Sequence, residues 1–95
     1  HEREFRQEQW SQSALEQELQ AIEGLPSDLN IRKPNNPFWQ SIFRIAGIAK
    51  TGFISKDDAL NKIKWACRHM NLQGREVEYQ WNRAYQRATA RYLND

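Results

Sequence analysis

The chain is poor in the features that mark enzymes, metal proteins and membrane proteins. It has one cysteine and two histidines among 95 residues, no glycine-rich phosphate loop, and no apolar run long enough to span a bilayer. Because no apolar run could span a bilayer, we expect no membrane contact. The single cysteine, Cys67, cannot form an internal disulfide, so we expect a reducing, cytoplasmic compartment. His69 has no partner His or Cys at ligand spacing, and we interpret Asp57 and Asp58 as helix-capping residues. We therefore expect no cofactor, no metal and no enzyme activity from this chain alone.

Strand signals are also missing, because apolar and polar residues do not alternate strictly and β-branched residues are few. Apolar residues recur with helical spacing instead. This spacing predicts helices near residues 11–23, 37–50, 56–70 and 75–92. Asn36 before Pro37 is typical of a helix start, and so is Ser55 followed by Asp58. Gly52 suits the turn that ends the second helix.

The N-terminal residues are the least defined part of this pattern. Residues 1–10 are mostly charged and polar, and we expect an N-terminal extension or a frayed helix start there. The first helix is predicted to begin with a cap at either Ser11 or Ser13. Residues 11–95 then form a single helical domain, and His1, in place of Met, indicates a fragment or a processed product.

The predicted fold class is all-α: a small four-helix bundle with three core helices and an N-terminal acidic helix. The second predicted helix is apolar around much of its circumference, so we expect it to be central. The shared core is predicted to contain side chains from the last three helices, namely Trp39, Ile42, Phe43, Ile63, Ala66, Trp81 and Tyr85.

Charge is distributed unevenly along the chain. Residues 1–31 contain seven acids and two bases, whereas residues 32–95 contain twelve bases and five acids. The net charges of these two parts are therefore −5 and +7. A basic body favours a polyanionic partner, and the acidic first helix either packs on that body or is solvated.

A regular row of arginines occupies the fourth predicted helix. Arg83, Arg87 and Arg91 are four residues apart, so they lie along one side of a helix. Two interpretations are open. The row is a solvated helix edge, with cations placed favourably near the helix C-terminus, or it binds a polyanion such as nucleic-acid phosphate.

A second basic and aromatic group is predicted on the third helix. Trp65 lies off the core stripe, close to Lys64 and Arg68, and a tryptophan among cations is what a base-stacking surface requires. The alternative is that the first helix covers Trp65. Arg32 and Lys33 add two cations in a loop, where contacts are often made. We predict that all these residues contribute to one nucleic-acid-facing surface.

Several short motifs occur in a recognisable order. They are a helix-starting asparagine, a small-residue pair, a glycine before an acidic helix start, a leucine–glutamate turn and a closing tryptophan–arginine pattern: Asn35 or Asn36, Ala46–Gly47, Gly52 to Asp58, Ala66–Cys67, Leu72 with Glu76, Trp81, Arg83–Ala84, Ala88 and Arg91. Over roughly residues 13–92 the order resembles the α-helical segment that follows the catalytic domain in bifunctional primase–polymerase proteins of phages, plasmids and integrated elements. Ala90 and Cys67 depart from the pattern, since Pro and Ala are common there.

The resemblance implies a helical accessory domain of a DNA replication primase. Such a domain helps to bind template or initiating nucleotide and links catalytic parts, with a neighbouring catalytic domain of the same chain as a partner. We therefore predict a nucleic-acid- or nucleotide-binding module whose partner is single-stranded DNA or a nucleotide. The alternatives are a protein–protein adaptor and a structural spacer without nucleic-acid contact. A helix-turn-helix reader is less favoured, because the third helix has few base-reading side chains.

Overall fold

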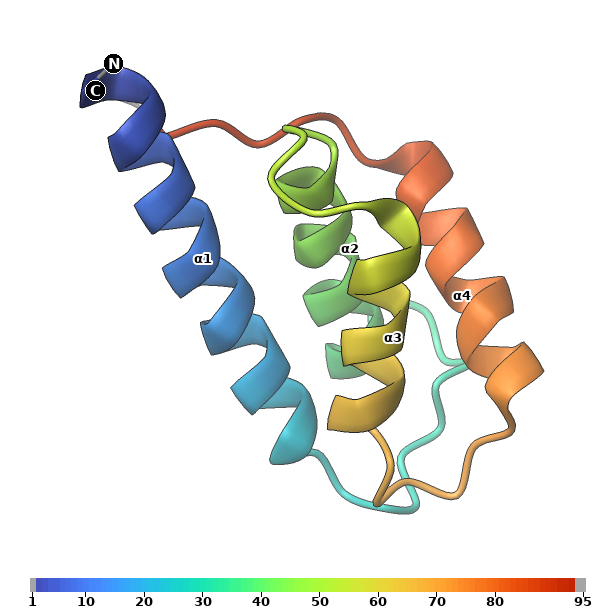
Figure 1. Cartoon of the computed structure of the whole chain (residues 1–95). Coiled ribbons are helices and arrows are strands. Elements are labelled where there is room, and N and C mark those ends of the chain that lie inside the picture. Colours follow the sequence, from blue (N-terminus) through green and yellow to red (C-terminus); the bar gives the residue numbers. More distant parts are fainter. Residues whose placement is uncertain (1, 94–95) are drawn as a thin grey trace.

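The computed structural model describes residues 2–93. Helices are the only regular secondary structure in this range, so the predicted all-α class is confirmed. The helices are α1 (Glu2–Glu23), α2 (Pro37–Ala49), α3 (Lys56–Ala66) and α4 (Gly74–Arg87). In Figure 1, α1 and α4 lie on the two sides of the molecule, with α2 and α3 between them. Both outer helices pack against α2 and α3, and within residues 2–93 they do not pack against each other. The described chain contains no helix that is both long and apolar enough to cross a membrane.

Local signals set the starts of α2 and α3. The side-chain oxygen of Asn36 accepts a hydrogen bond of 2.9 Å from the amide of Trp39, and Pro37 takes the first helical position. The hydroxyl of Ser55 accepts a 3.0 Å bond from the amide of Asp58. Between these helices Gly52 has a backbone φ of 91°, which residues with a Cβ rarely adopt. The predicted caps and the turn are therefore confirmed.

The first helix is longer than predicted. Neither Ser11 nor Ser13 begins it, because α1 is continuous from Glu2 to Glu23. Ser11 is fully buried, and its hydroxyl accepts a 2.8 Å bond from the side chain of Gln7, one turn earlier. The physical reason is that the Glu, Gln and Arg residues of the first turns are good helix formers, so no cap is needed at Ser11.

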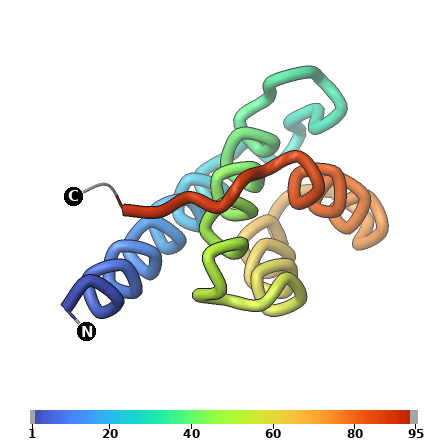
Figure 2. Tube along the Cα trace, turned by 90° about the horizontal axis from the view of Figure 1, so that it is seen from above, coloured from blue at the N-terminus to red at the C-terminus, as the bar shows by residue number. Residues whose placement is uncertain are grey.

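The last helix is shorter than predicted, because α4 ends at Arg87 and residues 88–93 are extended. This C-terminal segment crosses from α4 over α2 towards α1 (Figure 2). Lys50 donates a 2.7 Å bond to the carbonyl of Ala88, and the Arg91 amide donates a 2.9 Å bond to the carbonyl of Gly47. Gly47 permits this approach, since an added Cβ would lie 3.1 Å from the Thr89 carbonyl oxygen. Tertiary hydrogen bonds thus replace the last helical turn.

The core confirms most of the predicted side chains and corrects one. Ile42, Ile63, Ala66 and Trp81 are buried together, and Trp39 and Tyr85 pack against this cluster while partly exposed. Phe43 was expected in the core, but 38% of it is exposed. Phe38, one and a half turns earlier on α2, is fully buried instead. Helix α2 is apolar on most sides, so its packing partners decide which phenylalanine is buried.

Candidate nucleic-acid interface

Two arginines of α4 lie over a tryptophan of α2. The guanidinium carbons of Arg83 and Arg87 are 5.3 and 5.9 Å from the centre of the Trp39 ring, within the range of cation–π contacts. Arg83 also lies 5.7 Å from the ring of Tyr79, one helical turn earlier, which is 62% exposed. The flank of α4 that carries the predicted arginines therefore carries aromatic rings as well.

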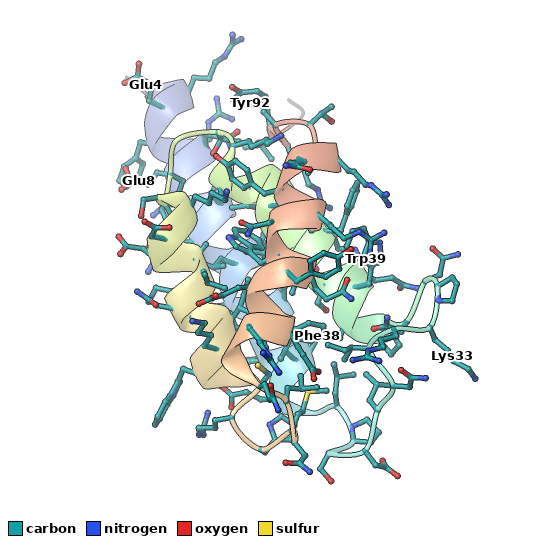
Figure 3. The ribbon with its side chains drawn as sticks, turned by 90° about the vertical axis from the view of Figure 1, so that its right-hand side faces the viewer. Glu4, Glu8, Lys33, Phe38, Trp39 and Tyr92 are labelled. Carbon is teal, nitrogen blue, oxygen red and sulfur yellow. The ribbon has the colours of Figure 1, made fainter. Side chains whose placement is uncertain are left out.

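The connection between α1 and α2 brings two more cations to this flank. Asn36 fixes the connection, because its amide nitrogen donates to the carbonyl oxygens of Ile31 and Lys33 at 2.9 and 2.7 Å. Figure 3 shows Trp39 beside α4 and Lys33 at the outer side of the connection. We name the resulting hollow of about 200 Å³ the α2–α4 groove; its charged and aromatic lining residues are Arg32, Lys33, Trp39, Arg83 and Arg87.

The α2–α4 groove continues along α4. A neighbouring hollow of about 510 Å³ shares Arg32 and Arg83 with it and adds Arg75 and Tyr79. Arg32 reaches a carboxylate oxygen of Glu76 only at 4.0 Å, and that pair is largely solvated. Within residues 2–93, neither Arg83 nor Arg87 forms an ion pair with a carboxylate. Their positive charge is therefore available to a bound anion.

The third arginine of the predicted row leaves this flank. Arg91 lies in the extended C-terminal segment, and its guanidinium carbon is 5.5 Å from the ring of Trp10 on α1. The expected four-residue periodicity stops at Arg87 because the helix does. Only Arg83 and Arg87 thus form the row on α4.

The sequence did not predict that an aromatic ring lines the groove. Trp39 packs against the core as expected, but it is only partly buried and also lines the groove; its ring lies 6.0 Å from that of the exposed Phe43. Their four-residue spacing, like that of Tyr79 and Arg83, was a signal that they share a helix face. The sequence does not show that the faces of α2 and α4 meet, because this depends on how the helices pack.

The α3 group lies elsewhere on the bundle. Trp65 is 66% exposed, so the alternative that α1 covers it is wrong. The guanidinium carbon of Arg68 is 4.2 Å from its ring centre, and Lys64 forms a 2.6 Å ion pair with Glu78. Trp65 and Leu19 of α1 line a hollow between α1 and α3. Because α1 and α4 do not pack together in the described chain, this hollow and the α2–α4 groove occupy different edges of the bundle.

The predicted residues are thus divided by the structure. Arg32, Lys33, Arg83 and Arg87 come together, while Arg91 lies at α1. Trp65 lies on the edge between α1 and α3, with Arg68 on its ring, and Lys64 is paired with Glu78 of α4. A nucleic-acid contact by Trp65, Lys64 and Arg68 stays a prediction. It would be a second contact and not a continuation of the first.

A larger hollow at one end of the bundle has a different character. It measures about 850 Å³ and lies where the first turns of α1 meet the α2–α3 turn and the C-terminal segment. Its lining includes Glu4, Glu8 and Tyr92, which Figure 3 shows at the same end of the molecule. The two carboxylates outnumber the one cation of this lining, Arg3, and so disfavour phosphate there. The basic groove is therefore the better candidate for a polyanion.

The remaining titratable groups do not form a recognisable reaction centre. Within residues 2–93, no three His, Cys, Asp or Glu side chains gather closely enough to hold a metal ion. Burial raises the pKa of the Cys67 thiol by removing it from water, so the side chain is a protonated, weakly reactive part of the core. The Nε2 atom of His69 lies 2.8 Å from the Leu25 carbonyl oxygen, so His69 joins the α3–α4 connection to the α1–α2 connection.

Comparisons with family models, curated proteins and solved structures found no significant match to this chain. They neither support nor oppose the primase–polymerase resemblance. The geometry and charge of the α2–α4 groove are therefore the basis on which a function can be assigned.

Proposed function

We propose that this chain is a helical domain that binds single-stranded nucleic acid in the α2–α4 groove. The observation that carries the proposal is the placement of Arg83 and Arg87 over the Trp39 ring, next to the loop cations Arg32 and Lys33. A single strand offers phosphates to the cations and base faces to the rings. A basic patch without exposed rings would instead suit any polyanion.

The stacked arginines are suited to phosphate binding. A guanidinium that lies on an indole keeps its N–H groups at the edge of the plane, where they can donate to phosphate oxygens. Arg83 is oriented further by a 3.3 Å bond to the side-chain oxygen of Gln80. Because Arg83 is already oriented in this way, it loses less conformational entropy on binding.

Tyr79 is suited to a base. Its ring is 62% exposed beside Arg83, so one face can stack on a nucleobase while Arg83 holds an adjacent phosphate. Stacking of this kind contributes about 1–3 kcal/mol per base and depends little on sequence. The proposed binding is therefore weakly sequence-specific.

The primase resemblance gives this activity a context, which we propose on the motifs alone. The domain would hold template, or the initiating nucleotide, beside a catalytic domain of the same chain. Helix α1 lies on the other side of the bundle from α4 (Figure 1), and its excess of acidic residues would keep phosphate away from that side. The strand would thus approach from the α4 side.

The test is a fluorescence-anisotropy titration of labelled single-stranded DNA at several salt concentrations. Arg83→Ala/Arg87→Ala should weaken binding to all sequences and flatten the salt dependence by about 1.4, since each single-strand phosphate contact contributes roughly 0.7 to the slope. The matched control is Arg44→Gln/Lys56→Gln, which removes the same charge from residues that line none of the hollows described above. The control should change affinity much less.

Tyr79→Ala separates stacking from charge. It should cost about 1–3 kcal/mol of binding free energy and leave the salt slope unchanged. If a folded Arg83→Ala/Arg87→Ala protein binds DNA with unchanged affinity and slope, the arginines are only a solvated helix edge. The adaptor and spacer alternatives would then be favoured.

A further inference from the structure

Trp65 is the most exposed large apolar side chain among the described residues, at 66%, and it stands beside a hollow. The hollow measures about 340 Å³; its lining residues are Leu19, Glu23, Asn61, Lys62, Trp65 and Ala66. Leu19 and Ala66 give it an apolar floor. An exposed tryptophan next to an apolar hollow is typical of a protein-binding surface, because both bury apolar area when a partner covers them.

The Trp65 side chain is held in place before any partner binds. The guanidinium carbon of Arg68 lies 4.2 Å from its ring centre, and an Arg68 N–H donates a 2.8 Å bond to the Trp65 carbonyl. One ring face is therefore covered and the rest of the ring projects. A fixed side chain loses little rotamer freedom on binding, and Trp and Arg are enriched among residues that dominate interfaces.

Charges of both signs flank the same hollow. Glu23 comes from the end of α1 and Lys62 from α3, and neither forms an ion pair within residues 2–93. A surface with a projecting ring, a hollow, an acid and a base can complement a second copy of itself. A two-fold axis that passes midway between the two charges places each base opposite the acid of the other copy, and two-fold dimers are the commonest oligomers.

We propose that this α1–α3 face binds a second copy of the chain in a two-fold symmetric dimer. Trp65 of each copy enters the hollow of the other, and Lys62 of each copy faces Glu23 of the other. A base stacking on Trp65 is the competing occupant. It is disfavoured because Glu23 flanks the same hollow and repels phosphate, and because Lys64 is already paired with Glu78.

The dimer leaves the nucleic-acid groove open. The α2–α4 groove lies on another edge of the bundle, so each copy would present its own groove. The dimer does not depend on nucleic-acid binding, and its test needs no nucleic acid. Failure of one proposal is therefore distinguishable from failure of the other.

The experiment is analytical ultracentrifugation of the chain over a wide concentration range. We expect a concentration-dependent monomer–dimer equilibrium for the wild-type protein. Trp65→Ala should raise the dimer dissociation constant by about 30-fold or more, as truncation of a central interface tryptophan does. Tyr79→Ala is the matched control, since it removes an aromatic ring of similar exposure from α4 and should leave the equilibrium unchanged.

A charge exchange tests the two-fold geometry. Glu23→Lys and Lys62→Glu should each weaken the dimer, because like charges then face each other twice. An equimolar mixture of the two variants should form a heterodimer, since opposite charges face each other again. Circular dichroism checks that each variant is folded.

Three outcomes would overturn the proposal: a wild-type protein that is monomeric at every concentration, a folded Trp65→Ala protein that dimerises normally, or weakened charge variants whose mixture shows no heterodimer. Base stacking can be tested in a variant whose other three tryptophans are changed to Phe, so that Trp65 alone fluoresces. If the wild type is monomeric and single-stranded DNA quenches this fluorescence, base stacking is the correct role for the Trp65 ring.

Discussion

The two phenylalanines of α2 offer a sharp test of the packing. Phe38 is fully buried in the core, whereas Phe43 is 38% exposed and lies 6.0 Å from the Trp39 ring. Phe38→Ala and Phe43→Ala delete the same atoms from the same helix. The difference between their effects on the free energy of unfolding therefore measures burial alone.

The structure gives the two magnitudes. Phe38→Ala should cost about 3–5 kcal/mol, because it removes a buried ring and leaves a cavity. Phe43→Ala should cost about 1 kcal/mol or less, since its ring is partly in water already and Ala has the better helix propensity. A domain of this size has roughly 5–14 kcal/mol of stability in total. Phe38→Ala alone should therefore remove a large share of it.

Guanidinium unfolding followed by circular dichroism measures both effects. The unfolding midpoint should fall strongly for Phe38→Ala and slightly for Phe43→Ala, with similar slopes. Phe38→Leu provides a milder variant if the alanine protein is largely unfolded in buffer. Equal losses, or a larger loss for Phe43→Ala, would show that the packing of α2 described here is wrong.

Three further changes test other parts of the structure. Gly47→Ala should lower the unfolding midpoint, because overpacking against Thr89 costs about 1–3 kcal/mol and the gain in helix propensity offsets only about 1 kcal/mol of this. It should also speed hydrogen exchange at the Arg91 amide, which donates to the Gly47 carbonyl. Asn36→Ala should destabilise the domain by about 1–3 kcal/mol in denaturant unfolding and weaken DNA binding, because the cap and two loop hydrogen bonds are lost together. Burial raises the pKa of the Cys67 thiol, so the folded protein holds this proton more tightly than the unfolded chain does. The Cys67 thiol therefore contributes its full share to the free energy of unfolding below the ordinary thiol pKa of about 8.5, and this share is lost as the pH rises through the higher pKa of the folded protein. Cys67→Ala should not show this loss. Cys67 should also resist alkylation at neutral pH until denaturant is added.

Much of the fold follows from local signals. The starts of α2 and α3 were predictable because a cap needs only a few neighbouring residues, as at Asn36 and Ser55. The buried positions of Ile63 and Trp81 were predictable because each lies on the apolar side of a two-faced helix. Helix α2 has no such polar side, so its sequence could not tell Phe38 from Phe43.

The candidate sites were predictable only in part. The spacing of Arg83 and Arg87 places both on one flank of a helix, whatever that helix packs against. The sequence also indicated that Trp65 lies off the core side of α3. It did not indicate that Trp39 lies beside the arginines, since this contact joins α2 to α4.

The amino-acid sequence by itself determined the helical class, the caps, the turn at Gly52 and the basic character of residues 32–95, because each depends on composition or on residues a few positions apart. The tertiary structure decided where α4 ends, because Lys50 donates to the Ala88 carbonyl and the Arg91 amide donates to the Gly47 carbonyl, and these bonds hold the segment 88–93 against α2. It also decided which cations share a groove, because this depends on which helix faces meet. Arg91 therefore lies at α1, while Arg83 and Arg87 lie with the loop cations at Trp39.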